Sequence, residues 1–499
     1  MPGRAERDVE PEHRSAPIGR SAGRGFGWAL AGSLVFKAGS FLVGLVMVRL
    51  LAPHDFGLYA VALAANAFVM HVNDMGMIAA TVQWRGQVEE MAATATSMAI
   101  GFSLSWYALF WLVAPVIANL AGSPDATPLV RLLTLTIVLD GVTAVSVGVV
   151  QRRFQQDKLM KAIALGFAVS AVVSVTLAVQ GAGAYSFVLG TLAQSLVVAV
   201  LVLRIARVPL RLGFDRAIAR RLWIFGAPLA VGLGIESVLL YSDSVIVGHV
   251  LGTVTLGLYL LAFNISSWVP GMLGTAVRYV SIPAFSRLAE GAQDNFANGV
   301  QRSLPLMVAV VAPVAAVMVA LATPLLHVLY GAHWVPAADA LRFLAVVMLA
   351  RMITALVFDV QTGLGNTKVS VWLNLVWLLA LLPALWIGAH VGGMGGAAAG
   401  HALVALLVAI PLAIWLLHRS GVDMRPVLRG VVRPGLAGIA AGLVMAGAAW
   451  RLDVPVVQLV VGGSIGGLCY LLLAVPARAR SVAWARAASF WAQRRGASA

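Results

Sequence analysis

The chain has 499 residues, of which 60% are hydrophobic and only 11% are charged. Soluble globular domains carry about 25% charged residues, so this composition excludes an ordinary soluble protein. The net charge of +15 would suit a nucleic-acid-binding protein, but apolar runs of 18 or more residues recur along the whole chain and indicate a membrane protein instead. The single cysteine, Cys469, lies inside an apolar run, so no disulfide is expected.

The apolar runs predict about fourteen transmembrane helices joined by short connections, and hence an all-α polytopic membrane protein. An Arg-rich segment, residues 1–24, precedes them. It is expected to be a disordered, uncleaved cytoplasmic tail, because no short apolar core with a cleavage site follows it. The helices are expected near residues 25–48, 56–78, 94–119, 129–150, 159–179, 184–204, 222–249, 256–277, 304–324, 338–362, 369–389, 394–417, 431–450 and 455–476.

An internal repeat organises these helices. The segment VRLLAPHDFGLYAVALA (residues 48–64) returns 200 residues later as GHVLGTVTLGLYLLAFN (residues 248–264), and Gln151 and Lys158 match Gln361 and Lys368 at a spacing of 210. Such duplication predicts two pseudo-symmetric six-helix lobes around a central cavity, followed by a C-terminal helix pair. The expected parts are an N-terminal lobe (25–204), a basic cytoplasmic linker (205–221), a C-terminal lobe (222–417), the helix pair (431–476) and a basic cytoplasmic tail (477–499).

The distribution of Lys and Arg predicts the orientation in the membrane. With the N-terminus inside, 29 of the 35 Lys and Arg residues fall on the cytoplasmic side and 4 on the outer side. Positive charge accumulates in cytoplasmic loops, so both termini are expected in the cytoplasm. The basic residues are then expected to set the orientation in the membrane and to contact membrane lipids, and no nucleic-acid partner is expected.

Four ionisable residues are expected near the centres of their helices: Lys37, Asp140, Glu236 and Arg351. Charges at this depth are unfavourable and usually mark a substrate pathway or an ion pair. In one interpretation they line a central cavity, where Lys37 and Arg351 face an anionic substrate. In the other, Lys37–Asp140 and Glu236–Arg351 are ion pairs within each lobe that only neutralise each other.

Two further charges are candidate cavity residues with weaker support. Asp243 lies one to two turns beyond Glu236, and Arg278 lies at the end of the helix expected at 256–277. Helix capping or snorkelling to the interface accounts for them equally well. Aromatic residues near predicted helix ends are expected to be interfacial anchors. They include Trp28, Tyr107, Trp268 and Trp334.

The sequence contains no motif for catalysis. A Walker loop, an HExxH zinc motif and a Cys/His cluster are all absent, and the glycines of VGGMGGAAAG near Gly392 indicate close helix packing. We therefore expect neither an enzyme, nor a metal site, nor a cofactor.

Several motifs resemble the polysaccharide-transporter flippases of the multidrug/oligosaccharidyl-lipid/polysaccharide exporter superfamily. They are VRLLAPHDFGLYAVA (48–62), NDMGMIAATVQW (73–84), QRRFQQDKL (151–159), YSDSVIVGHVLGTVTLGLY (241–259) and IPAFSRL (282–288). One departure is that Ser244 and His249 stand where this family is expected to carry Arg.

The resemblance implies a flippase in the bacterial cytoplasmic membrane. It would move a polyprenyl-diphosphate-linked oligosaccharide outward by alternating access of the two lobes, for cell-surface polysaccharide biosynthesis. A polysaccharide polymerase and other assembly proteins are further candidate partners. A lipid II flippase and a drug/cation antiporter of the same superfamily are the alternatives. A membrane glycosyltransferase or polymerase is disfavoured, because the outer loops are short and offer little room for catalytic groups.

Overall fold

The computed structural model describes residues 39–73, 77–84, 88–153, 155–208, 211–268, 293–363 and 367–475. The chain divides into two compact units, residues 1–42 and residues 43–499. Only residues 39–42 of the first unit are described, and they begin a helix over Gly39–Leu50. The elements discussed below all belong to the second unit.

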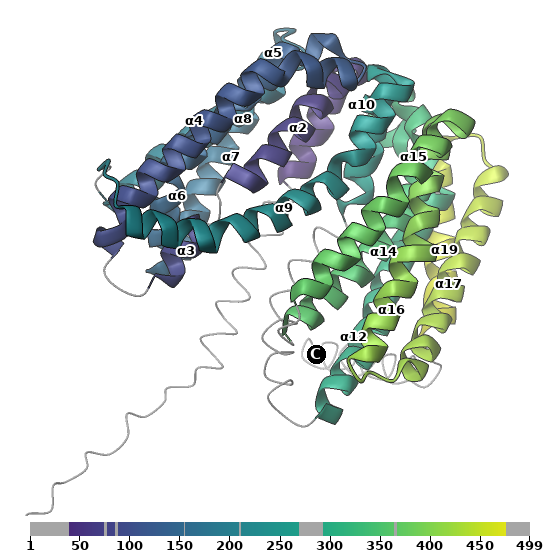
Figure 1. The fold of residues 1–499 in the computed structure, drawn as a ribbon. Coiled ribbons are helices and arrows are strands. Elements are labelled where there is room, and N and C mark those ends of the chain that lie inside the picture. Colours follow the sequence, from purple (N-terminus) through teal and green to yellow (C-terminus); the bar gives the residue numbers. More distant parts are fainter. Residues whose placement is uncertain are drawn as a thin grey trace, which may run out of the picture. The chain divides into compact units, whose positions relative to one another are not determined.

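Every regular element in these described ranges is a helix (Figure 1). Nine helical stretches there are long and apolar enough to cross a membrane, and three shorter apolar helices accompany them. The predicted all-α polytopic fold is confirmed, whereas the count of fourteen crossings remains a prediction. The elements are α2 (Pro53–Asn73), α3 (Met77–Gln83), α4 (Val88–Leu120), η1 (Pro124–Ala126), α5 (Thr127–Leu133), α6 (Leu135–Arg152), α7 (Gln156–Val179), α8 (Tyr185–Ala206), α9 (Arg216–Leu251), α10 (Thr253–Ser266), α12 (Gln293–Ala320), α13 (Ala322–Tyr330), η2 (Ala332–Ala337), α14 (Ala338–Gly363), α15 (Thr367–Val404), η3 (Ala405–Ala409), α16 (Ile410–Arg419), α17 (Met424–Trp450), α18 (Pro455–Val457), η4 (Gln458–Gly462) and α19 (Gly463–Ala474).

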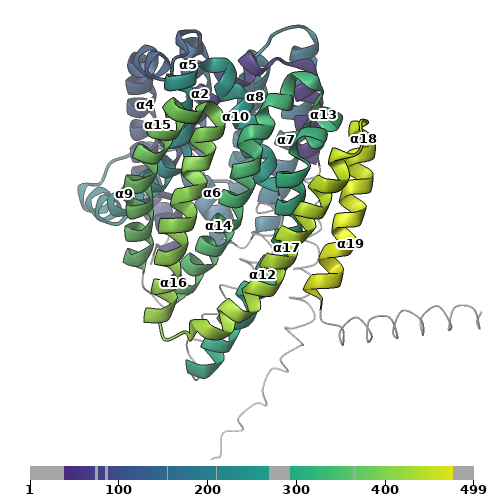
Figure 2. The same ribbon diagram turned by 90° about the vertical axis from the view of Figure 1, so that its right-hand side faces the viewer.

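Neighbouring helices pack in the same order in both halves of the chain. In the first half α4 packs on α6 and α6 on α8; in the second half α12 packs on α14 and α14 on α15. The C-terminal helix α17 lies along α12, and α19 lies along α17 (Figure 2). Gly438 and Gly442 of α17 face Ala312 and Ala316 of α12. Small residues let membrane helices approach closely, which is a main source of their packing energy.

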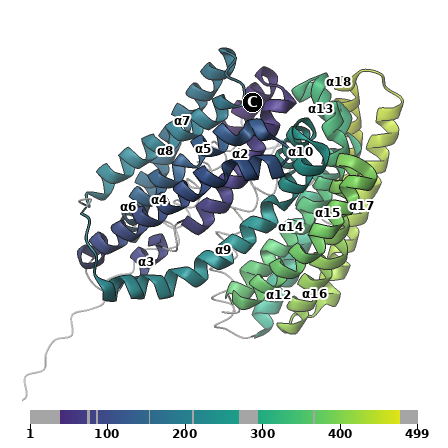
Figure 3. The same cartoon turned by 45° about the horizontal axis from the view of Figure 1, so that its top comes forward.

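Helix α9 connects the two halves. It contacts α3 and α4 near its start and α10 and α15 further along (Figure 3). The helix begins at Arg216 because Asp215 caps it: the carboxylate Oδ1 accepts the backbone N–H groups of Ala217 (2.8 Å) and Ile218 (3.0 Å). The last six residues of the segment predicted as a linker, 205–221, are therefore already helical.

The helix predicted at 369–389 is the first arm of the bent helix α15, and the helix predicted at 394–417 starts with its second arm. They meet at a break where Gly392 and Gly393 leave helical geometry, and Gly393 has φ +59°. The arms then touch at Gly388 and Gly396, where a Cβ on either residue would collide with the carbonyl oxygen of the other. The second arm continues into the π-helix η3, because Pro411 has no N–H to bond the carbonyl of residue 407.

The two copies of the sequence repeat contact each other directly. A Cβ on Gly57 of α2 would collide with the carbonyl oxygen of Thr253, and a Cβ on Gly257 of α10 would collide with that of Pro53. Pro53 and Gly57 are the repeat equivalents of Thr253 and Gly257, so each copy of the repeat makes the same close contact with the other. The close approach explains why both copies carry glycine at this position.

A second pair of repeat-equivalent residues, Arg49 and His249, joins the two halves of the chain in the same region. Arg49 donates from Nη2 to the carbonyl of Val328 (3.2 Å) and from Nε to that of Leu329 (3.3 Å), at the end of α13. Its equivalent, His249, contacts the carbonyl of Leu120 through Nδ1 (2.6 Å), at the end of α4. A carbonyl can only accept, so Nδ1 of His249 carries the proton. We call this region, residues 48–57, 120–123, 248–257 and 328–334, the hairpin end.

Trp334 also belongs to the hairpin end, and its predicted role as an interfacial anchor is wrong. Its side chain is only 2% exposed and donates from Nε1 to the carbonyl of Val48 (3.1 Å). Its ring packs edge-on against Phe56, with centroids 4.9 Å apart. Position near the end of a predicted helix does not distinguish an aromatic ring that faces lipid from one that joins two halves of the fold.

Candidate functional site

Four polar side chains from four helical segments gather in the interior of the second half of the chain. Asp243 comes from α9, Tyr259 from α10, Arg351 from α14 and His401 from the second arm of α15. We call them the C-lobe cluster. The Tyr259 hydroxyl donates to Asp243 Oδ2 (3.2 Å), and the backbone N–H of Ser244 donates to Oδ1 (2.9 Å). Asp243, Tyr259 and His401 are each at most 2% exposed.

His401 has an unsatisfied nitrogen inside this cluster. Its Nδ1 lies 3.8 Å from Asp243 Oδ2, which is too far for a hydrogen bond, and the buried Nδ1 has no other hydrogen-bond partner among the described residues. A buried polar atom without a partner lowers the stability of the fold by about 1–3 kcal/mol, so this arrangement requires an explanation. The π-helix η3 begins four residues after His401. Such irregularities in helices frequently accompany functional sites.

Arg351 is the cation of the cluster. Its guanidinium carbon lies 6.0 Å from the ring centroid of Phe263 and 6.0 Å from that of Trp377. Its charge acts electrostatically on Asp243, Tyr259 and His401, and also on Tyr241. Aromatic faces attract a cation and shield it from lipid, so this environment can hold a positive charge within the membrane.

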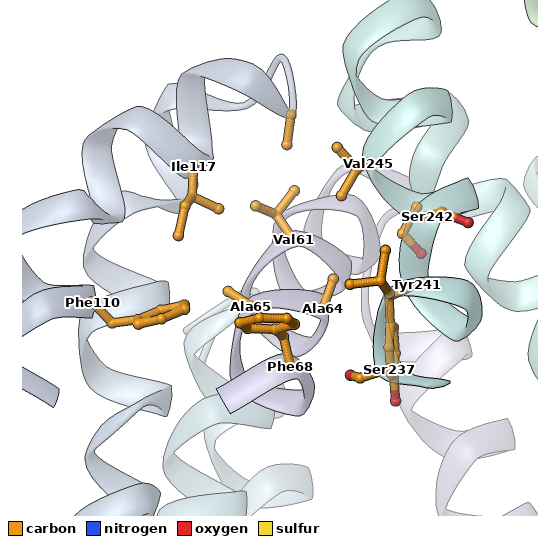
Figure 4. A pocket seen from close by; sticks show the side chains of 13 residues that line it. Val61, Ala64, Ala65, Phe68, Phe110, Ile117, Ser237, Tyr241, Ser242 and Val245 are labelled. Atoms are coloured by element: carbon orange, nitrogen blue, oxygen red, sulfur yellow. The ribbon is translucent and has the colours of Figure 1, made fainter. Parts of the chain in front are cut away.

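A pocket of about 200 Å³ lies between α2 and α4 on one side and α9 on the other. Figure 4 shows its lining, which is mainly aliphatic and aromatic. Tyr241 connects it to the C-lobe cluster, because this residue lines the pocket and lies within reach of the Arg351 charge. Ser237, also in the lining, is fully buried, and its hydroxyl has no hydrogen-bond partner in the part of the chain that the structure describes. The pocket therefore offers apolar surface together with an unsatisfied hydroxyl group.

Asp140 occupies the related position in the first half of the chain, on α6. The amide nitrogen of Asn73 on α2 donates to Asp140 Oδ2 (3.4 Å) and to the carbonyl of Ile137 (3.2 Å), while the buried Asn73 Oδ1 has no partner within the described ranges. Asp140 and Arg351 thus lie on equivalent helices with opposite charge, as the repeat predicted.

The structure brings two of the predicted site residues together, namely Asp243 and Arg351. Asp140 belongs to the separate environment on α6. Lys37 and Arg278 lie outside the described residues, and so does the side chain of Glu236, whose backbone is part of α9. The predicted pairs Lys37–Asp140 and Glu236–Arg351 therefore stay predictions.

Sequence reasoning missed the neutral members of the site. Tyr259 was visible as part of the repeat, where it matches Tyr59, but nothing in the pattern indicated that its hydroxyl meets Asp243. His401 could have been found as an ionisable residue within a predicted helix. Ser237, Tyr241 and Trp377 carry no such signal, because uncharged polar and aromatic residues are common in membrane helices.

Comparison with known families identifies the chain. The model of the polysaccharide biosynthesis protein family matches residues 46–339, more than half of the sequence. The chain belongs to the polysaccharide biosynthesis protein family. It is similar to the succinoglycan biosynthesis transport protein ExoT of Rhizobium meliloti (strain 1021), with 26% identity over 466 residues, covering 90% of this chain and 92% of that protein. It is also similar to the lipopolysaccharide biosynthesis protein WzxC of Escherichia coli (strain K12), with 22% identity over 387 residues, covering 76% and 77%.

Solved structures support the fold of this family member. The lipid II flippase MurJ in an inward closed conformation superposes with a TM-score of 0.70 at 14% identity, covering 89% of this chain and 97% of that one. An inward-facing multidrug resistance MATE transporter reaches 0.59 at 16% identity, covering 79% and 98%. The matches confirm the predicted polysaccharide-transporter resemblance and the multi-pass membrane fold. By family and relatives, the chain is a membrane transporter and not an enzyme.

Proposed function

We propose that this protein moves a polyprenyl-diphosphate-linked oligosaccharide across the bacterial cytoplasmic membrane by alternating access of its two lobes. The observation that carries the proposal is Arg351, a cation within a membrane helix, held between aromatic rings in a chain of the polysaccharide biosynthesis family. A diphosphate is a compact anion that suits a guanidinium, which can bind two of its oxygens at once.

The pocket between α2, α4 and α9 supports the same substrate class. A prenyl chain is apolar, and Val61, Phe68 and Phe110 supply matching surface. Tyr241 lines this pocket and interacts electrostatically with Arg351, so we propose that a lipid keeps its first prenyl units in the pocket and its diphosphate near Arg351. A lipid-linked glycan has the two matching parts, an apolar prenyl chain and an anionic diphosphate.

The hairpin end supports alternating access. The repeat-related glycine contact and the bonds from Arg49 and His249 join the two halves of the chain there. On the Lys/Arg distribution, this end faces the outside. The conformation is then closed toward the outside, and release of the glycan requires these contacts to open.

Cysteine labelling tests the proposed orientation. Thr255 lies in the first turn of α10 at the hairpin end, and Arg216 begins α9 next to the basic linker. In a Cys469→Ser background, Thr255→Cys should react with a membrane-impermeant maleimide in intact cells. Arg216→Cys should react only after permeabilisation. Labelling of Arg216→Cys in intact cells would invert the proposed topology.

A reconstituted assay tests the function itself. The purified protein would be placed in liposomes carrying a fluorescent polyprenyl-diphosphate oligosaccharide, and an impermeant quencher would report how much substrate changes leaflet. We expect translocation well above that of protein-free liposomes. Parallel liposomes with lipid II, and others with a cationic dye, address the alternatives. Transport of the dye but of neither lipid would contradict the proposal.

A further inference from the structure

The C-lobe cluster contains two groups that can share a proton but are not bonded in this structure. The 3.8 Å gap between His401 Nδ1 and Asp243 Oδ2 is about 1 Å longer than a charge-assisted hydrogen bond. Both side chains are 2% exposed, so water does not freely satisfy the nitrogen. A small shift of the second arm of α15 toward α9, together with one proton, would complete the bond.

The surroundings determine what that proton would change. Arg351 of α14 acts electrostatically on both residues, Tyr259 of α10 donates to Asp243, and Tyr241 of α9 lies within reach of Asp243. Trp377 packs edge-on against His401 with ring centroids 6.4 Å apart. Asp243 and Arg351 carry opposite charges that offset each other as long as His401 is neutral.

The remaining helices packed against α9 and α15 add few ionisable groups. Helix α2 carries His54, Asp55, Tyr59 and His71, of which Tyr59 interacts electrostatically with Tyr241. Helix α3 and the π-helix η3 contain no titratable residue, and α4 carries only Glu89, Glu90 and Tyr107. On α9 itself, Glu236 precedes Asp243 by seven residues, and its side chain lies outside the described residues. Asp243 and His401 are therefore the two described groups placed to exchange a proton here.

We propose that Asp243 and His401 form a proton-binding site, and that a proton taken up there weakens the electrostatic attraction between Asp243 and Arg351 so that Arg351 binds an anionic diphosphate more tightly. The net charge of Asp243, Arg351 and His401 rises from zero to +1 with the proton, and no other atom is exchanged. A carboxylate and a diphosphate compete for the same guanidinium, so neutralising the carboxylate favours the diphosphate. The part about diphosphate rests on the proposed function; the proton site does not.

The first measurement follows the proton without transport. A protonated imidazole quenches a neighbouring indole, so Trp377 reports on His401. The fluorescence of purified full-length protein would be recorded from about pH 5 to pH 8.5, and the curve of Trp377→Phe subtracted. We expect one titration step that His401→Gln removes and Asp243→Asn displaces along the pH axis. His390→Gln is the matched control, because His390 lies exposed on the same helix and packs at a tilt against Trp386, with ring centroids 4.8 Å apart. A step that persists in His401→Gln would overturn the site.

The second measurement uses inorganic diphosphate and calorimetry on the same full-length variants. Comparing each variant with wild type at the same pH removes the titration of diphosphate itself. Asp243→Asn imitates the protonated carboxyl group, so at about pH 8 it should bind diphosphate about tenfold or more tightly than wild type, and equally well at about pH 5. A merely structural role for Asp243 predicts weaker binding in the variant at every pH. That result would reject the inference.

The two proposals can fail separately. Translocation of the lipid-linked oligosaccharide at the same rate across this pH range, in wild type, would reject the coupling of the proton to Arg351 and leave the proposed function standing. Tighter diphosphate binding by Asp243→Asn, with no translocation of that lipid, would keep the proton site and reject the proposed substrate.

Discussion

Replacing Arg351 with alanine should abolish translocation of the lipid-linked oligosaccharide while the protein still inserts and folds. The guanidinium is the described cation of the C-lobe cluster, and losing a buried charged contact to an anionic substrate costs about 2–5 kcal/mol, or roughly 30-fold to several thousand-fold in rate. Arg351→Lys should keep part of the activity, because lysine supplies the charge but not the planar pair of donors. The liposome assay, normalised to reconstituted protein, measures both.

Double variants separate substrate binding from ion pairing. If Arg351 only neutralises a carboxylate, removing that carboxylate as well should restore activity, because no stranded charge remains. Arg351→Ala would be combined with the removal of one of two carboxylates. Asp243 is chosen because Arg351 acts on it electrostatically, and Glu236 because the sequence predicts it as the ion-pair partner of Arg351. We expect the double variant that combines Arg351→Ala with Asp243→Asn to remain inactive. We expect the same of the double variant that combines Arg351→Ala with Glu236→Ala. Full activity in either one would leave Arg351 as an ion-pair partner and nothing more.

Replacing Gly57 with valine should prevent the hairpin end from closing. The new side chain would collide with the carbonyl oxygen of Thr253, which is backbone and cannot rotate away. Overpacking of this kind costs about 1–3 kcal/mol, so the closed conformation should lose most of its population. Gly257→Val should act in the same way, because the contact of Gly257 with Pro53 is the repeat equivalent. Both variants should translocate little substrate.

A crosslink distinguishes lost closure from misfolding. The hydroxyls of Ser123 and Thr253 lie 2.6 Å apart across the hairpin end. With Cys469 replaced by serine, Ser123→Cys and Thr253→Cys should form a disulfide readily, and Gly57→Val should reduce its yield without lowering the amount of folded protein. Gly101→Val is the control, since no described atom beyond its own stretch of helix lies within 4 Å of a Cβ at Gly101. Unchanged crosslinking and transport in Gly57→Val would refute the role given to this contact.

Local patterns in the sequence are enough to identify the class of protein, most helices and the repeat. A segment that crosses lipid must bond all its backbone groups internally and carry apolar side chains, so a local run of residues is enough to identify it. The break between the arms of α15 was predicted between 389 and 394 for the same local reason, because Gly392 and Gly393 interrupt the run. Asp243 and Arg351 were found as charges where lipid disfavours them.

Which of these residues come into contact depends on how the helices pack against each other. A membrane helix that is apolar on every side gives no periodic signal for its buried face, so its rotation about its own axis cannot be inferred from the pattern. That rotation places Asp243 against Tyr259 and His401, and not at an interface or a cap. The contact between Gly57 and Thr253, and its repeat equivalent, likewise arise from two helices crossing 200 residues apart in the chain. Contacts between helices depend on how their surfaces fit together, and a single helix does not contain that information.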